Sequence, residues 1–328
     1  MAAPSFRGKF VWHDLMTTDP ARAIAFYGKV AGWTVQPHQM DPSYRMISIG
    51  DSGVGGVMDL PEQARSMGAP THWISYIATP DVDATVRDAR AMGATVYVEP
   101  ADIPNVGRFA ILADPEGASF AAFCPSPAMP GEGVPEAPTR GHFSWHELAA
   151  SNWKAEWDFY VKLFGWVEDS RMDMGATGPY VMFKRAGGTL PVGAMFAKSP
   201  DMKMPTAWLP YVVVPSADKA AATCVAGGGK ILNGPMDIPG GRIAQCMDPQ
   251  GGAFAVHSLT PAPAATKPAK PAAKRSVKKA ARTTAARKTV KKSAKTTAKK
   301  AVKKAPKKKT AKPAARKKAA ARKVKKRK

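Results

Sequence analysis

The sequence predicts an α+β protein that contains two copies of one unit, followed by a disordered and strongly basic tail. Three observations support this prediction: an internal repeat, strand and helix patterns that alternate in the same order in each copy, and a change of composition after residue 260. The predicted domains are residues 1–125 and 141–260, with a Pro- and Gly-rich linker at 126–140 and a tail at 261–328.

Two blocks of sequence recur in the same order. Residues 10–33 and 143–166 share Phe, Trp-His, an acid and Leu, and then Phe-Tyr and Gly-Trp, in one register. Later in each copy, Gly-Arg followed by Asp-Pro-x-Gly and Phe occurs at 107–120 and again at 241–254. Two matched blocks at nearly the same offset are not expected by chance, so the chain contains a duplicated unit.

Within each copy, a strand, a helix and further strands are expected twice. Strand character over Lys9–Thr17 precedes a helix that begins with Asp19 as N-cap and Pro20 in its first turn. A second strand over Trp73–Ala78 precedes a second helix over Val82–Ala91. The chain as a whole is therefore expected to contain four modules of this kind.

The net charge of +24 belongs to the tail alone. Residues 1–260 carry 20 basic and 25 acidic side chains, whereas residues 261–328 carry 29 basic side chains and no acidic one. The tail is nearly all Ala, Lys, Arg, Pro, Thr and Val, and it resembles the C-terminal tail of linker histones. Because such a segment has little apolar surface to bury and strong self-repulsion, we expect it to be disordered on its own.

A uniform run of positive charge indicates that the tail binds nucleic acid or another polyanion, by neutralising phosphates and releasing counterions. No element that reads bases accompanies it, so we expect little sequence specificity, and DNA and RNA are not distinguished. The expected nucleic-acid-binding residues are clustered lysines of the tail: Lys278, Lys279, Lys291, Lys292, Lys303, Lys304, Lys307, Lys308, Lys309, Lys317, Lys318, Lys325 and Lys326.

No apolar run approaches the roughly 18 residues that a membrane span needs, so no membrane partner is expected. The three cysteines, Cys124, Cys224 and Cys246, lie far apart without the spacing of a zinc or redox motif, which favours a reducing cytoplasm. With the basic tail, this predicts a cytoplasmic protein associated with the nucleoid. The sequence leaves the oligomeric state open.

The body of the chain resembles the vicinal-oxygen-chelate superfamily, which holds glyoxalases, extradiol dioxygenases and bleomycin-resistance proteins. The resemblance covers about residues 8–259 and rests on a first-strand His, the Phe-Tyr and Gly-Trp of the next helix, and the late Asp-Pro-x-Gly turn. It implies paired βαβββ modules, each pair forming a cup-shaped sheet around a ligand cavity. It implies less about activity, because the family includes metal-dependent lyases, oxygenases and binders without catalysis.

Enzymes of this family usually hold one divalent metal with His and Glu ligands. His13 and His146 match the first-strand ligand position, so a divalent metal at these residues is one interpretation. The last-strand Glu of the family is replaced by Ala121 and Ala255, and the other expected ligands are also missing. Because a lone His does not hold a metal tightly, a His that orients a ligand or packs is favoured, and no other cofactor is indicated.

Four further side chains are candidates for the cavities. Tyr76 and Tyr211 are equivalent, and the parity of the family's strands turns them inward. Arg108 and Arg242 lie on a late strand, where an anionic or carbonyl-bearing ligand and a solvated strand end are equal alternatives. For the repeated Trp and Phe-Tyr residues, core packing is favoured over ligand stacking. The predicted cavity residues are thus His13, Tyr76, Arg108, His146, Tyr211 and Arg242.

Three functions remain to be distinguished. The first is a protein that binds a small molecule in each cup, without catalysis, and is tethered to nucleic acid by its tail. The second is an enzyme, a metal-dependent lyase or dioxygenase of the same superfamily. The third is an architectural protein of the nucleoid. The missing metal ligands favour the binder over the enzyme, and the retained His13 and His146 keep the enzyme open.

Overall fold

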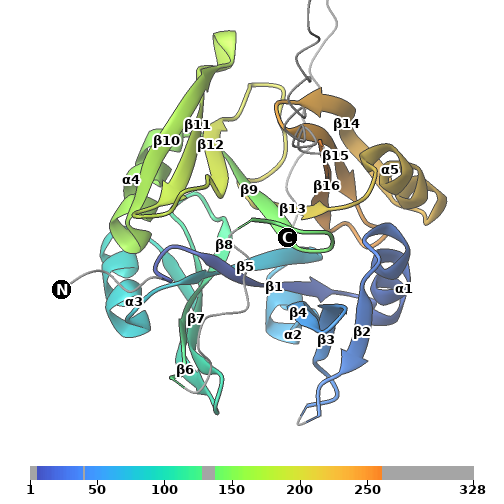
Figure 1. Ribbon diagram of the computed structural model, residues 1–328. Coiled ribbons are helices and arrows are strands. Elements are labelled where there is room, and N and C mark those ends of the chain that lie inside the picture. The colour runs from blue at the N-terminus through green and yellow to red at the C-terminus, as the bar shows by residue number, and fades with distance from the viewer. Residues whose placement is uncertain (1–5, 40, 128–136, 261–328) are drawn as a thin grey trace, which may run out of the picture. The chain divides into compact units, whose positions relative to one another are not determined.

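The computed structural model describes residues 6–39, 41–127 and 137–260 of the 328-residue chain (Figure 1). These residues form two eight-stranded mixed sheets, one in each copy. Most of the predicted linker and the whole predicted tail, with its lysines, lie outside the described residues. Within those ranges, no helix combines the length and the apolar character that crossing a membrane requires.

The first copy consists of two modules, each a strand, a helix and three strands. A short helix, α2, connects them, and no sequence pattern predicts it. In order the elements are β1 (Phe10–Thr17), α1 (Pro20–Val30), β2 (Thr34–Pro37), β3 (Arg45–Ile49), β4 (Ser52–Asp59), α2 (Glu62–Ser66), β5 (His72–Ala78), α3 (Val82–Ala91), β6 (Thr95–Ile103), β7 (Gly107–Ala113) and β8 (Ser119–Pro125).

The second copy repeats this order without a counterpart of α2, so the prediction of an α+β tandem of paired modules is confirmed. Its elements are β9 (Phe143–Ala150), α4 (Trp153–Phe164), β10 (Trp166–Asp173), the 3-10 turn η1 (Gly175–Thr177), β11 (Pro179–Arg185), β12 (Gly193–Ala197), β13 (Trp208–Val213), α5 (Ala217–Ala226), β14 (Lys230–Ile238), β15 (Gly241–Met247) and β16 (Ala253–Leu259).

The long helices begin at side-chain caps. The side chains of Asp19, Asp81, Asn152 and Ser216 each accept a backbone N–H from the first turn of the helix that follows. Pro20 occupies the first turn of α1, as the sequence predicts. Proline lacks a backbone N–H, and the N–H groups of the first turn have no acceptor within the helix, so no hydrogen bond is lost there.

The first strands of the two modules lie side by side at the centre of each sheet. The strand orders are β2-β3-β4-β1-β5-β8-β7-β6 and β10-β11-β12-β9-β13-β16-β15-β14. Successive residues of a strand point to opposite faces, so each sheet has a face that carries the helices and an opposite face. We call the opposite face the open face; Trp12 and Asp14 lie on it in the first copy, and Trp145 and Glu147 in the second.

Both main hydrophobic cores are built from the two copies together. In one, Leu15 and the buried side of α1 pack against α5, β13 and β16. In the other, α3, β7 and β8 pack against α4 and against Trp166 of β10. Figure 1 shows α1 beside α5 and α3 beside α4, and the two helices of each pair are in contact. The helix-bearing face of each sheet is therefore covered by the other copy.

Candidate functional site

The repeated Tyr and Asp residues join the two copies to each other. The phenol of Tyr27 in α1 donates to the carboxylate of Asp248 in the second copy over 3.0 Å. In return, the phenol of Tyr160 in α4 donates to Asp114 in the first copy, also over 3.0 Å. All four side chains are buried. The helix Tyr and the late Asp-Pro turn are therefore partners across the interface between the copies.

The repeated Gly-Trp residues make a second reciprocal contact. The indole N–H of Trp33 donates to the carbonyl of Gly141 over 2.7 Å, and that of Trp166 donates to the carbonyl of Gly8 over 2.8 Å. Gly8 has a φ of +78°, and a Cβ there would meet the Phe164 carbonyl oxygen at 2.9 Å. These contacts show that the repeated Trp residues pack in the core, as the sequence analysis favoured.

The structure brings His13 and His146 together on the covered faces of the sheets. Their Nε2 atoms lie 2.7 Å apart, and the two residues are 4 % and 3 % exposed. Phe143 stacks on His13 with ring centroids 3.7 Å apart, and Phe10 stacks on His146 at 3.5 Å. Both histidines thus lie between the sheets, on the opposite side from Tyr76 and the open faces.

Burial controls the charge of this pair. Desolvation lowers the pKa of His146 to about 3, although its Nδ1 is hydrogen-bonded to the carbonyl of Val192 at 3.0 Å. Desolvation, followed by repulsion from His146, holds the pKa of His13 well below its ordinary value. Both imidazoles are therefore neutral at pH 7, and they act as packed polar groups of the interface.

Arg108 and Arg242 lie on the helix-bearing faces as well. The guanidinium of Arg108 forms two bonds of 2.7 and 2.9 Å with Asp83, which lies in the first turn of α3. Arg242 makes the corresponding contacts of 2.9 and 3.1 Å with Asp218 of α5. Each arginine is also paired with an aspartate of the neighbouring strand. The structure therefore separates both arginines from the two tyrosines.

The centre of the first open face is the buried carboxyl group of Asp14, which is 3 % exposed. Tyr76 donates to Oδ2 over 2.7 Å, and Tyr44 donates to Oδ1 over 2.7 Å. The indole N–H of Trp12 is shared between Oδ1, at 3.0 Å, and the Tyr44 oxygen, at 2.7 Å. We call these four residues the first acid–phenol network.

The second open face repeats the arrangement around Glu147. Tyr180 donates to its Oε1 and Tyr211 to its Oε2, and Trp145 donates to the Tyr180 oxygen over 2.8 Å. The amide of Gln245 adds a bond of 3.1 Å to Oε2. These five residues form the second acid–phenol network. Its longer acid and its Gln are the differences from the first network.

Burial also dominates the electrostatics of both networks. Desolvation raises the pKa of Asp14 and of Glu147, and the hydrogen bonds from the phenols act in the opposite direction. Desolvation raises the pKa of all four phenols, and the neighbouring carboxylate raises it further. The phenols therefore stay protonated and act as hydrogen-bond donors, which holds each acid in one orientation.

These residues can accept a ligand group but do not fit a divalent metal. Each carboxylate accepts three hydrogen bonds, and a carboxylate offers about four lone-pair sites, so one acceptor position is left. The surrounding groups present N–H and O–H donors rather than free lone pairs. Among the described residues, no group of three or more His, Cys, Asp or Glu side chains is arranged to hold a metal.

Sequence reasoning named Tyr76 and Tyr211 but missed the acids to which they donate. It also missed Tyr44, which lies directly before β3, and Tyr180, which lies in β11. One signal was available: an acid follows the first-strand His in both copies, and strand parity places it on the face opposite that His.

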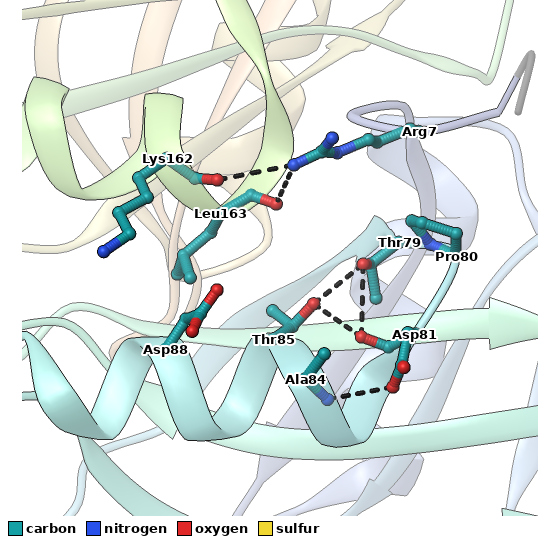
Figure 2. A pocket seen from close by; sticks show the side chains of 9 residues that line it. All are labelled: Arg7, Thr79, Pro80, Asp81, Ala84, Thr85, Asp88, Lys162 and Leu163. Carbon is teal, nitrogen blue, oxygen red and sulfur yellow. Dashed lines mark hydrogen bonds between the residues drawn. The ribbon is translucent and has the colours of Figure 1, made fainter. Parts of the chain in front are cut away.

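A small pocket lies elsewhere, between the two copies (Figure 2). It has a volume of about 140 Å³ and is lined by Arg7, the segment that leads into α3, one side of α3 as far as Asp88, and the end of α4. Arg7 donates to the carbonyl of Leu163 over 3.1 Å, and Thr79 and Thr85 are bonded to each other over 2.7 Å. Much of its polar wall is therefore paired internally, and it contains none of the predicted cavity residues.

Comparison with known families identifies the family to which each domain belongs. Residues 11–123 match the glyoxalase-like domain family, and residues 141–256 match the glyoxalase/bleomycin resistance protein/dioxygenase superfamily. The chain contains two tandem glyoxalase-superfamily domains. The expected family is thereby confirmed for the body, whereas the resemblance of the tail to linker histones lies outside the described residues.

Two relatives differ in how much of the chain they match. The chain is 44 % identical over 122 residues to CFP32 of Mycobacterium bovis, a glyoxylase by name, and spans only 45 % of that protein. It is 28 % identical over 277 residues to the anthracycline biosynthesis protein DnrV of Streptomyces peucetius, covering 77 % of this chain and 94 % of DnrV. The second match includes both glyoxalase-superfamily domains.

Solved structures support the fold. The Mn(II)-bound glyoxalase of Novosphingobium aromaticivorans matches 78 % of this chain and 83 % of its own, with 17 % identity and a TM-score of 0.51. The 2,3-dioxygenase LapB of Pseudomonas sp. KL28 matches 77 % of this chain and 91 % of its own, with 12 % identity and a TM-score of 0.51. At this identity, the likeness concerns the architecture of the tandem alone.

Proposed function

We propose that each open face binds a small planar organic molecule beside its buried acid, without using a metal. The observation that carries the proposal is the acid–phenol network, which recurs around Asp14 and Glu147 at equivalent positions of the two domains. Preorganised polar groups of this kind orient a ligand because the hydrogen bonds around them are already fixed.

The surroundings of the networks suit an aromatic ligand. Trp12 and Tyr44, like Trp145 and Tyr180, are only partly buried, so rings are accessible beside each acid. Aromatic faces of this kind stack on planar molecules, and the acid can accept a hydrogen bond from the ligand. The likeness to DnrV, whose name places it in anthracycline biosynthesis, supports a fused-ring aromatic as the class of ligand.

Titration of the full chain with 2-naphthol, a planar and uncharged aromatic alcohol, tests this function. Isothermal titration calorimetry should find two sites per chain. The substitutions Asp14→Asn and Glu147→Gln should each abolish one site, because an amide cannot accept from the phenols on both sides. Absence of binding, or two unchanged sites in both variants, would contradict the proposal.

A metal-dependent lyase or dioxygenase is the rival function. It is supported by the family, which includes glyoxalases and dioxygenases, and not by the donors around the two acids. Elemental analysis of the purified chain separates the two functions. One tightly held metal per domain, lost on substitution of Asp14 or Glu147, would favour the enzyme over the binder.

We also propose that the tail, residues 261–328, tethers the protein to nucleic acid. Its 29 basic side chains, without an acidic one, support the proposal. If about ten of these charges engage DNA phosphates, the logarithm of affinity should fall with the logarithm of salt concentration with a slope near −9. Affinity that survives removal of residues 261–328 would contradict the tether, and a phenotype that needs the tail alone would favour an architectural role.

A further inference from the structure

The two open faces differ at three equivalent positions beside the acid–phenol networks. The second face carries Ser144, Gln245 and His257, where the first carries Val11, Ile111 and Phe123. The strand pairing supports the equivalence: Gln245 lies opposite Ala255 just as Ile111 lies opposite Ala121, and His257 lies opposite Ile243 just as Phe123 lies opposite Phe109. Three polar side chains thus replace three apolar ones.

These residues belong to the same face as the networks. Val11, Ile111 and Phe123 pack in the apolar cluster that contains Tyr76. On β16, Ala253 and Ala255 pack in the cluster that contains Tyr211. Since side chains alternate along a strand, His257 lies on the same face as these two alanines. The differences therefore concern the surroundings of the proposed ligand, not the interface between the domains.

Gln245 presents a hydrogen-bond acceptor on the second face. Its Nε2 donates to Glu147 over 3.1 Å and to the Tyr211 oxygen over 2.8 Å. This fixes the orientation of the amide, because a carboxylate oxygen accepts and the amide nitrogen is the group that donates. The amide oxygen then receives no hydrogen bond from the described residues, and Gln245 is only partly buried.

His257 adds a second polar atom without a partner. Its Nδ1 lies 3.1 Å from the Ser144 hydroxyl, whereas its Nε2 is buried and forms no hydrogen bond with the described residues. Burial lowers the pKa of the imidazole, so it is neutral, and Nε2 either donates or accepts according to the tautomer. An unpaired buried polar atom destabilises the protein, and a ligand group that pairs with it removes this cost.

We propose that the second open face prefers an aromatic ligand that carries a hydroxyl group, whereas the first open face has no such preference. This inference rests on the proposed function and adds the chemical class of ligand for each domain. The residues that determine the specificity are Gln245 and His257, with Ser144 as a positioning residue for the imidazole.

A hydroxyl group can pair with these residues in either tautomer of His257. It can donate to the Gln245 amide oxygen, and it can accept from or donate to His257. Ile111 and Phe123 offer no partner, so a hydroxyl placed against them would lose its hydrogen bonds to water without replacement. A hydroxyl group is therefore favoured on the second face and not on the first.

Two uncharged probes of similar size, 2-naphthol and 2-methoxynaphthalene, test the inference, because only the former donates a hydrogen bond. In calorimetric titrations of the full chain, one of the two sites should bind 2-naphthol about tenfold more tightly than the methyl ether, the factor expected for one net hydrogen bond. The double substitution Gln245→Ile/His257→Phe should remove this preference, because both partners of the hydroxyl group are then absent.

The reciprocal substitution Ile111→Gln/Phe123→His supplies the matched control. It should raise the number of sites that prefer 2-naphthol from one to two. If both probes bind and neither double substitution changes the preference, the inference is overturned and the proposed function stands. If neither probe binds the wild-type chain, the proposed function and the inference are overturned together.

Discussion

The interface between the two domains and their open faces have diverged to different extents. At the interface, each repeated residue keeps its identity and its reciprocal partner, as Tyr27 with Asp248 and Tyr160 with Asp114 illustrate. On the open faces, the acid changes length and three neighbours change from apolar to polar. The repeated Tyr, Asp, Trp and Gly residues thus mark the packing between the domains, whereas Ser144, Gln245 and His257 mark a difference beside the proposed ligands.

The largest expected effect comes from breaking the interface. Trp166 is 1 % exposed and packs with Tyr160, Phe183 and Phe10, the last of which belongs to the other domain. Trp166→Ala should lower the free energy of unfolding by about 3–5 kcal/mol. Because the core is shared, urea unfolding should remain a single transition that both domains follow. Met172→Ala, on an exposed position of the same strand, is the control.

The histidine pair gives the next effect, through pH. The folded-state pKa of His146 is about 3, below the unfolded value near 6.5, so the unfolded state binds the proton first. Stability from this group is present above pH 6.5 and is lost as the pH falls toward 3. Between pH 7 and pH 5 the loss should be about 2 kcal/mol. His146→Gln should lose less stability over the same interval than the wild type.

Asp14 and Glu147, whose folded-state pKa is raised, also contribute to the pH dependence of stability. Because wild type and variant both contain these acids, their contribution cancels in the comparison. Urea unfolding at the two pH values measures the difference. An equal loss in both proteins would show that the pair titrates normally in the folded state.

A smaller effect separates the two acid–phenol networks. Tyr76 is the sole described donor to Oδ2 of Asp14, whereas Oε2 of Glu147 also accepts from Gln245 when Tyr211 is removed. Tyr76→Phe should therefore cost about 1–2 kcal/mol of unfolding free energy and Tyr211→Phe less, measured by urea unfolding at pH 7. The same cost in both domains would mean that Gln245 does not support the acid.

The smallest effect is expected at the arginines. Arg108 and Arg242 are paired with exposed aspartates on the helix-bearing faces, and ion pairs of this kind contribute little. Arg108→Ala should change neither the unfolding free energy measurably nor the affinity for 2-naphthol. A clear loss of affinity would place this arginine in contact with the ligand after all.

Much of the fold could be predicted because its signals are local or repeated. The start of α1 at Asp19-Pro20, the bounds of α3 and the separation of β1 into two faces follow from caps and from periodicity. The short helix α2 could not be predicted, since its cap has no side-chain hydrogen bond and none of its residues is buried.

The site could be predicted only in part, because it depends on which face of each sheet the other domain covers. Strand parity separates His13 from Asp14 but does not tell which of them meets the partner sheet. The aromatic residues that enclose His13 and His146 come partly from the other domain, more than 100 residues away in sequence. Tyr44 and Tyr180 could not be predicted for a similar reason, because their hydroxyls reach the acids from other elements, the loop before β3 and β11.

The reciprocal contacts of Trp33 with Gly141 and of Trp166 with Gly8 have the pattern of a symmetric dimer in which the two subunits have become one chain. In a dimer of identical subunits, any change in the gene alters both sites at once. Fusion of the subunits removes that constraint, because each half is then encoded separately. One binding site could therefore acquire a new ligand while the other kept the old one, on a scaffold that both halves still have to share.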